Sequence, residues 1–432
     1  MRSLLILFLL CALPGAKAQT TPQPGDTTQV SQQARTTAYT LPPDKLKKSR
    51  ALYLLDNKLQ VIDTAYGFLV LLGLLSLGIA ARYRDWAQKV SRYRIIQALI
   101  FVPLLLLTIS ILNLPLSLYS HHISLQYGFS VQGWSSWFLD FAKSELVNLV
   151  IFIPLLWLMM VIIRRSPRRW WFYFWLISLP ILFFVALIAP VAIDPLYYNF
   201  TPLENSQPQL VEQLEKVVQR GGLEIPRSRM YEMDASRKVT TLNAYVTGFG
   251  PSKRVVVWDN TIKKMTVPEI TFVFGHEMGH YVLNHVIQGL IAGAIGLLIA
   301  LYIVYRAAGW FLRRFQQRWH IRELSDWAAL PMIFLLFGIL GFIAEPIGNT
   351  YSRYLEHQAD IYGLEITHGI NPDSQEAAAH AFQVLGEVSL DYPYPSRLAV
   401  IWYWNHPPIS DRVRLAHEYD PWSKGGSPKY VK

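Results

Sequence analysis

The stretch FGHEMGHYVLNH, residues 274–285, stands directly before the uncharged and almost wholly apolar run VIQGLIAGAIGLLIALYIVY, residues 286–305. Its histidines His276 and His280 are four residues apart, so both lie on one face if the stretch is a helix. Two imidazoles placed in this way can bind one metal ion, and Glu277 beside them can polarise a metal-bound water. The apolar run is long enough to cross the ~30 Å hydrocarbon core of a bilayer as a helix. These two neighbouring stretches predict a metal site at the edge of a membrane.

The composition places the chain among membrane proteins. Of 432 residues, 52% are hydrophobic and only 16% are charged, and the 14 Trp and 23 Tyr have rings that favour the membrane interface. The formal net charge is +10, yet much of it falls in short clusters beside apolar runs, a pattern typical of membrane orientation. We therefore expect membrane lipids as a partner, and no nucleic acid.

Six uncharged apolar stretches are each about long enough for one membrane crossing. They are residues 64–81, 95–119, 146–163, 170–193, 286–305 and 327–344. The alternative, a set of buried helices in a soluble protein, would need a very large and wholly apolar core. We predict a predominantly α-helical, multi-pass membrane protein with four membrane helices in residues 63–193 and a membrane hairpin in residues 286–344.

The N-terminus, MRSLLILFLLCALPGAKAQ, reads as a signal peptide over residues 1–18, because its apolar core is too short to span a bilayer and an A-x-A pattern ends at Ala18. An uncleaved membrane anchor is the alternative. Residues 19–62 follow as a polar segment, whose first part, to residue 45, reads as a linker. The single cysteine, Cys11, lies in the predicted signal peptide, so a cleaved chain has no disulfide, thiolate ligand or cysteine nucleophile.

Two polar segments carry the candidate site. Residues 194–285 contain an amphipathic helix, PQLVEQLEKVVQRGG, then three strand-like runs, RMYEM, LNAYVTG and KRVVVW, and finally a helix that holds the two histidines. Residues 345–420 form the second segment, and residues 421–432 a tail. The two crossings of the hairpin return the chain to the same side of the membrane, so the segments can meet and form a small α+β domain.

A catalytic zinc ion needs a third protein ligand and one open position for water. With cysteine excluded, the candidates are His, Asp and Glu, and the best stretch is SRYLEHQADIYG, just after the last apolar run. Glu356 and Asp360 are four residues apart on one predicted helix face. Glu356 can bind one Zn2+ together with His276 and His280, while Asp360 accepts the outer N–H of a ligating histidine. Two solvated carboxylates on a surface helix are the alternative for this stretch.

Four stretches together resemble the type I CAAX prenyl protease family of integral-membrane zinc metallopeptidases: HEMGHYVLNH, SRYLEHQAD, NAYVTGFGPSKRVVVWDNTI and HPPISDRV. The resemblance extends from the first apolar run to about residue 420. It implies membrane helices that enclose a large water-filled chamber. It also implies roles for the site: zinc ligation by His276, His280 and Glu356, general-base catalysis by Glu277, a hydrogen bond from a zinc-bound histidine to Asp360, binding of the substrate backbone by Asn243, and stabilisation of the oxyanion by His406 and Arg412.

Without the resemblance, several of these residues carry weaker signals. His406 precedes two prolines and reads as part of a loop turn, Arg412 reads as a surface cation, and Asn243 reads as a turn residue. His285 also matches the family pattern. Its spacing from His280 turns it away from a shared metal ion, so we expect it to have a structural role.

The basic loops predict the orientation in the membrane. Residues 82–94, 164–169 and 306–325 carry five, four and five basic residues, whereas residues 120–145 carry one. The positive-inside rule places the three basic loops in the cytoplasm and the site on the other side. Basic residues between positions 45 and 58 disagree. Together with a signal peptide, this orientation predicts a bacterial inner-membrane protein whose site faces the periplasm, where prenylated CAAX substrates are not expected.

Three functions remain open. The first is a zinc endopeptidase of the CAAX type, which removes C-terminal residues from a lipidated or otherwise hydrophobic peptide. The second is a quality-control metalloprotease of broad specificity, which acts on misfolded or membrane-inserted proteins. The third is a non-catalytic transporter with a degenerate metal motif. The absence of Asp, Glu, Lys, Arg and His from the six apolar stretches disfavours the third function.

Overall fold

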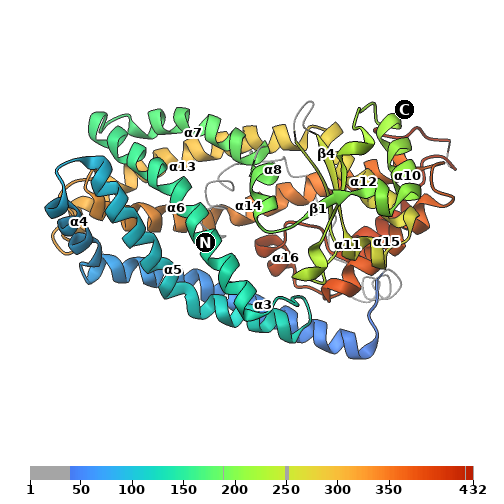
Figure 1. The fold of residues 1–432 in the computed structure, drawn as a ribbon, viewed down its shortest axis with the longest axis horizontal. Coiled ribbons are helices and arrows are strands. Elements are labelled where there is room, and N and C mark those ends of the chain that lie inside the picture. The colour runs from blue at the N-terminus through green and yellow to red at the C-terminus, as the bar shows by residue number, and fades with distance from the viewer. Residues whose placement is uncertain (1–38, 188, 249–252, 424, 432) are drawn as a thin grey trace, which may run out of the picture.

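The computed structural model describes residues 39–187, 189–248, 253–423 and 425–431, and this part of the chain is mostly helical (Figure 1). The predicted signal peptide and most of the predicted linker lie outside the described residues. Five of the described helices are long and apolar enough to cross a membrane. They are α3 (Pro43–Ser76), α5 (Arg94–Gln126), α6 (Trp134–Arg165), α13 (His285–Phe315) and α14 (Leu330–Thr367).

The remaining apolar stretch, 170–193, contains the shorter apolar helix α7 (Trp170–Leu187) and the short helix α8 (Ala189–Ile193). The bounds of the first long helix also differ from the expected run 64–81. α3 starts within the segment expected to be polar and ends at Ser76, and Gly78 at φ 67° leads into α4 (Ile79–Val90). The predicted class, a mostly helical multi-pass membrane protein with a small α+β domain, is confirmed.

The long helices lie side by side along the longest axis of the molecule (Figure 1). The sheet and the short helices gather at one end, and α4 lies at the other. Trp327, fully buried just before α14, stacks on Phe101 of α5, and its indole N–H donates to Gln97 Oε1 at 3.0 Å. This contact fixes the start of α14, the helix whose far end carries Glu356.

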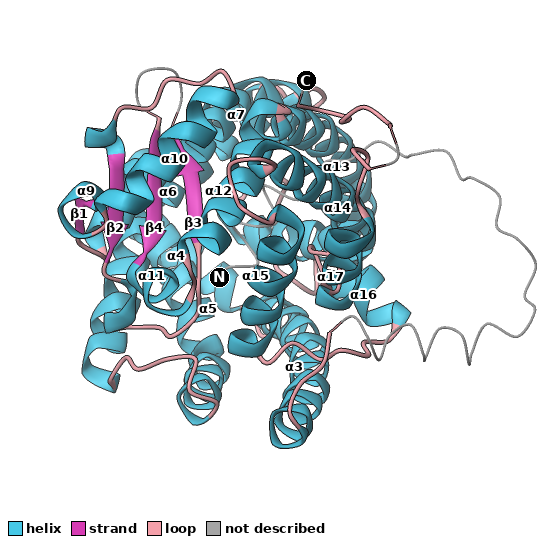
Figure 2. Ribbon diagram, turned by 90° about the vertical axis from the view of Figure 1, so that its right-hand side faces the viewer, coloured by secondary structure: helices cyan, strands magenta, loops and turns pink. Residues whose placement is uncertain are grey.

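The strands form one mixed sheet at one side of the molecule (Figure 2). They are β1 (Phe200–Pro202), β2 (Met230–Met233), β3 (Ala244–Thr247) and β4 (Arg254–Trp258), in the order β1-β2-β4-β3. β2 and β4 are parallel, and the other two pairs are antiparallel. The three predicted strand runs are confirmed as β2, β3 and β4. β1 was not predicted, because three residues ending in proline give almost no strand signal.

The helices of the α+β domain lie at the same end of the molecule as this sheet (Figure 1). They are α9 (Leu203–Ser206), α10 (Pro208–Arg220), α11 (Asp259–Lys264), α12 (Val267–Val282), α15 (Ser374–Ser389), α16 (Arg397–Tyr403) and α17 (Ile409–Glu418). α12 begins at a capping box in which Thr266 and Glu269 each bind the other's backbone N–H, with Pro268 in the first turn. It ends at Val282, and Asn284 adopts a left-handed φ of 58° that turns the chain into α13.

Glycines allow α12 and α14 to approach each other closely. A Cβ atom at Gly363 would lie 3.0 Å from the backbone nitrogen of His276, and one at Gly279 would lie 3.2 Å from Cα of Ala359. A Cβ atom at Gly275 would lie 3.4 Å from Cα of Gly363. α14 also runs without interruption through the domain boundary that we placed at residue 344. The third-ligand stretch is therefore the extension of a membrane helix, held against the histidine helix.

Candidate active site

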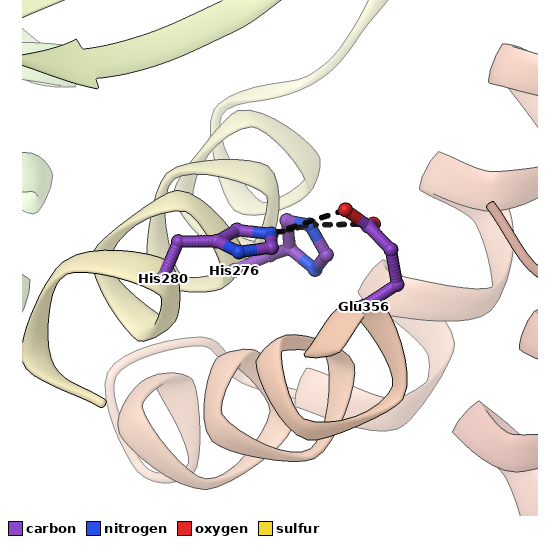
Figure 3. Close-up of side chains that lie close together, drawn as sticks. All are labelled: His276, His280 and Glu356. Atoms are coloured by element: carbon purple, nitrogen blue, oxygen red, sulfur yellow. Dashed lines mark hydrogen bonds and ion pairs between the residues drawn. The ribbon is translucent and has the colours of Figure 1, made fainter. Parts of the chain in front are cut away.

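Three side chains from two helices converge at the crossing of α12 and α14 (Figure 3). His276 Nε2 and His280 Nε2 are 3.2 Å apart, and they lie 3.4 Å and 3.3 Å from the two carboxylate oxygens of Glu356. Tetrahedral zinc ligands at ~2.0–2.1 Å from the ion are about 3.4 Å from one another. The three donors therefore have the mutual spacing of a zinc ligand set.

The chemistry of the donor set also fits zinc. Two imidazoles and one carboxylate are the protein ligands of many catalytic zinc sites. Glu356 Oε2 is buried and makes no hydrogen bond in the described part of the chain, and Arg412 Nη2 lies 3.8 Å from it. A buried carboxylate oxygen without a hydrogen bond is costly unless a cation satisfies it. The residues expected to bind zinc from the sequence are thus brought together, with His276 and Glu356 both buried.

Asp360 and Arg412 form a buried layer behind His276. The Asp360 Oδ1 atom lies 2.8 Å from His276 Nδ1, on the side of the ring away from the other two ligands. Arg412 donates from Nη2 and Nε to the two oxygens of Asp360 at 2.6 and 2.9 Å. A carboxylate held in this way fixes the tautomer and the orientation of a metal-binding histidine. Arg412 is buried, so the expectation of a surface cation from the residue alone was wrong.

A different residue, His285, supports His280. The Nδ1 atoms of His285 and His280 are 3.1 Å apart, and His285 Nε2 lies 3.0 Å from Gln358 Oε1. If His280 uses Nε2 for the metal, its Nδ1–H donates to His285 Nδ1, and the proton of His285 sits on Nε2 and is donated to Gln358. Gln358 was missed in the sequence, where only its place in SRYLEHQAD on the third-ligand helix could have indicated it.

The predicted orientation of His285 assumed one continuous helix. At a helical spacing of five residues the side chain would point away from His280. The left-handed residue Asn284 ends that helix and brings the imidazole of His285 back to the outer nitrogen of His280. His285 is thus not one of the three converging donors, as expected, but it contacts one of them directly.

Glu277 lines a cavity of about 590 Å³, and His276 and Glu356 line the same space. Burial raises the pKa of the Glu277 carboxyl, although His276 and His280 nearby oppose that shift. A carboxylate with a raised pKa is a better proton acceptor. Its position beside the ligands and in the cavity is the one expected of a general base.

The remaining predicted site residues also line this cavity, in different settings. His406 Nε2 lies 3.5 Å from Glu356 Oε1, while its Nδ1 lies 2.8 Å from Asn405 Oδ1. Burial lowers the pKa of His406, against the effect of the Glu356 carboxylate. Asn243 directly precedes the edge strand β3, and its backbone N–H and carbonyl bond the Thr261 hydroxyl at 2.9 and 2.8 Å.

Comparison with known proteins agrees with this site. A sequence profile described as Peptidase family M48 matches residues 204–420, and one described as CAAX prenyl protease N-terminal, five membrane helices, matches residues 27–199. The uncharacterized metalloprotease YhfN of Bacillus subtilis (strain 168) is 34% identical over 376 residues, which cover 87% of this chain and 86% of that protein. CAAX prenyl protease 1 of Saccharomyces cerevisiae is 26% identical over 332 residues, which cover 73% and 71%.

A solved structure is similar over most of its length. The crystal structure of S. mikatae Ste24p matches with a TM-score of 0.74 at 23% identity, covering 90% of this chain and 94% of that one. This likeness confirms the fold. The membrane helices and the His–His–Glu site define a multi-pass membrane zinc metallopeptidase. The chain belongs to peptidase family M48.

Proposed function

We propose that this peptidase is an endopeptidase that cuts near the C-terminus of a hydrophobic or lipidated peptide, as in CAAX prenyl protease processing. The observation that carries the proposal is the convergence of His276, His280 and Glu356 next to a cavity lined by Glu277. The match of the N-terminal segment to a profile of CAAX prenyl proteases supports the substrate class.

The roles of the residues follow from their positions. His276, His280 and Glu356 would hold the zinc ion, which would supply a Lewis acid for the attacking water and the substrate carbonyl. Glu277 accepts a proton from the attacking water as the water oxygen bonds to the carbonyl carbon. The peptide C–N bond then breaks, and Glu277 passes the proton to the leaving amine. The edge of β3 beside Asn243 can hold the substrate backbone as an added strand.

The structure suggests different roles for the two residues that the resemblance assigned to the oxyanion. Arg412 is bonded twice to Asp360, so we assign it to the positioning of His276. His406 remains at the cavity with Nε2 toward Glu356, where an imidazole that carries its proton on Nε2 can donate to a developing oxyanion. We therefore place oxyanion stabilisation mainly on His406.

A farnesylated C-A-A-X peptide tests the substrate class. The purified enzyme is incubated with this peptide, with the same peptide lacking the lipid, and with an unfolded model protein, and the products are identified by mass spectrometry. A single cut near the C-terminus of the farnesylated peptide is the expected result. Cuts spread along the unfolded protein, with no preference for the lipid, would instead favour a quality-control metalloprotease.

The alternative function, a quality-control metalloprotease, has its own support. The relative at 34% identity is a bacterial metalloprotease, and the positive-inside rule applied to the basic loops predicts a periplasmic site. We propose this orientation and an inner-membrane location. Fusion of the C-terminus to reporters that are active only in the cytoplasm or only in the periplasm tests it. A signal from the cytoplasmic reporter alone would contradict the proposed orientation.

A further inference from the structure

The first turns of α3 form a wall of the catalytic cavity. Tyr53, Asp56, Asn57 and Gln60 follow one another at intervals of three, one and three residues, which places them on one helix face. All four line the cavity that Glu277 lines. Polar side chains on a helix that goes on to enter a membrane face protein or water and not lipid. α3 thus presents a polar stripe to the space that the substrate would occupy.

This wall is fixed to the peptidase half of the chain. The ring of Tyr53 stacks on Tyr392 with centroids 5.0 Å apart. The Tyr53 hydroxyl bonds the hydroxyl and the backbone N–H of Ser396 at 3.1 and 2.9 Å. Lys45, about two turns earlier in α3, forms an ion pair with Glu387 of α15 at 3.1 Å. These contacts therefore hold the polar stripe of α3 in place as part of the cavity wall.

Asp391 directly precedes Tyr392, the residue on which Tyr53 stacks. Its backbone N–H donates to the Gly386 carbonyl at 2.9 Å, and its carbonyl accepts from the Tyr39 hydroxyl at 3.1 Å. Its carboxylate lines the cavity and, within the residues that the structure describes, makes no hydrogen bond or ion pair. Burial raises the pKa of Asp391 to about 6, although the charge of Arg412 opposes the shift.

The charges around the cavity do not balance. Arg412 is the one Arg or Lys among the described lining residues, and its guanidinium is bonded to Asp360. Glu356 is one of the three proposed zinc ligands, and Glu277 is the proposed base. Asp56 and Asp391 are left as two carboxylates for which no ion pair is found among the described residues, and Arg412 is the cation whose charge acts on Asp391. A partly buried carboxylate in that setting is stabilised when a positive charge enters the cavity.

We propose that Asp391 and Asp56 form an acidic subsite that binds a lysine or arginine side chain of the peptide substrate. The inference rests on the proposed peptidase function and specifies its substrate. A charged hydrogen bond in such a cavity contributes roughly tenfold to binding. The subsite would select where along a peptide the enzyme cuts, separately from any lipid on the substrate.

Paired peptides test the subsite. The two peptides of a pair are fluorogenic and lack a lipid, and they differ only in having Lys or Gln at one position. Separate pairs vary positions on either side of the scissile bond. For the wild type we expect kcat/KM to be about tenfold higher for Lys at one position, and we expect Asp391→Asn to remove most of that preference, measured as the ratio of kcat/KM for the two peptides. Asp56→Asn should reduce the preference in the same direction. Glu418→Gln, which removes an exposed carboxylate outside the cavity, is the control and should retain it.

The outcomes separate this inference from the proposed function. Equal cleavage of Lys and Gln peptides by the wild type at every position would overturn the subsite and leave the peptidase intact. If no peptide is cleaved at all, the peptidase proposal fails, and binding of the same labelled peptides to Glu277→Gln by fluorescence anisotropy still decides the subsite. Tighter binding of the Lys peptide that is lost in Glu277→Gln/Asp391→Asn would support it, and equal binding would overturn it.

Discussion

Arg412 and Asp360 form a buried, two-point ion pair, with Nη2 and Nε of Arg412 at 2.6 and 2.9 Å from the Asp360 oxygens. The same carboxylate lies 2.8 Å from His276 Nδ1. The third-ligand helix α14 and the C-terminal helix α17 are thereby joined directly to the histidine helix α12. The orientation of one zinc ligand depends in this way on a residue more than a hundred positions away in the chain.

Arg412→Lys should weaken zinc binding, because an ammonium group cannot make the two parallel hydrogen bonds of a guanidinium. Loss of a partner behind a metal ligand typically lowers affinity by about 10- to 100-fold. Zinc affinity is measured by competition with a chelating dye. Arg414→Lys, on the same helix in an exposed pair with Asp411, is the matched control and should bind zinc as the wild type does. Equal affinities for both variants would contradict the positioning role.

His285→Ala should also lower zinc affinity, by about tenfold, because His280 loses the acceptor for its Nδ1–H. His285→Asn is the informative partner, since its amide oxygen lies where Nδ1 of the imidazole lies and can still accept that proton. We expect His285→Asn to recover most of the affinity in the same competition assay. An Asn variant as weak as the Ala variant would mean that His285 acts by packing alone.

Gly363→Ala should destabilise the protein and disturb the metal site together. The new Cβ atom would meet the backbone of His276 at 3.0 Å, so α12 has to move away from α14. Such overpacking costs about 1–3 kcal/mol. Thermal unfolding of the purified protein in detergent reports the loss of stability. Gly289→Ala has open space around its Cβ position and serves as the control. An unchanged unfolding temperature for Gly363→Ala would contradict the close packing of the two helices.

The preference for a cationic peptide should depend on pH. The pKa of Asp391 is raised to about 6, so its carboxylate gains a proton as the pH falls through this value. The groups that face it are the Arg412 guanidinium, which opposes the rise, and the Tyr39 hydroxyl on its carbonyl. The ratio of kcat/KM for the Lys and Gln peptides should therefore fall between pH 7 and pH 5, whereas the shared catalytic groups cancel in the ratio. A ratio that stays constant over this range would exclude Asp391 as the binding group.

Helical spacing in the sequence predicted the three candidate metal ligands better than the residues that surround them. His276, His280 and Glu356 were found from helical periodicity, and their convergence needed only an even number of membrane crossings. The contact of His285 with His280 depends on the left-handed turn at Asn284, which periodicity does not encode. Asp391 lies in a loop, and nothing near it in the sequence indicates that it reaches the catalytic cavity.

The start of α3 is a second feature that the local sequence did not predict. Residues 43–62 are polar enough to be read as a segment ahead of the membrane, yet they form the first turns of α3. Their helical state is consistent with contacts to residues far along the chain, such as Tyr53 with Tyr392 and Lys45 with Glu387. Contacts of this kind cannot be deduced from local composition. The polar stripe of α3 therefore became part of the site only in the folded structure.

The most direct test of the central claim compares the wild type with Glu277→Gln, with zinc quantified in both preparations. Each is incubated with a fluorogenic peptide that the wild type cleaves. We predict one zinc ion per chain in both proteins and cleavage by the wild type alone, because the variant keeps the three ligands and loses the proton acceptor. Cleavage by Glu277→Gln at the wild-type rate, or a wild type that cleaves without bound zinc, would contradict the account.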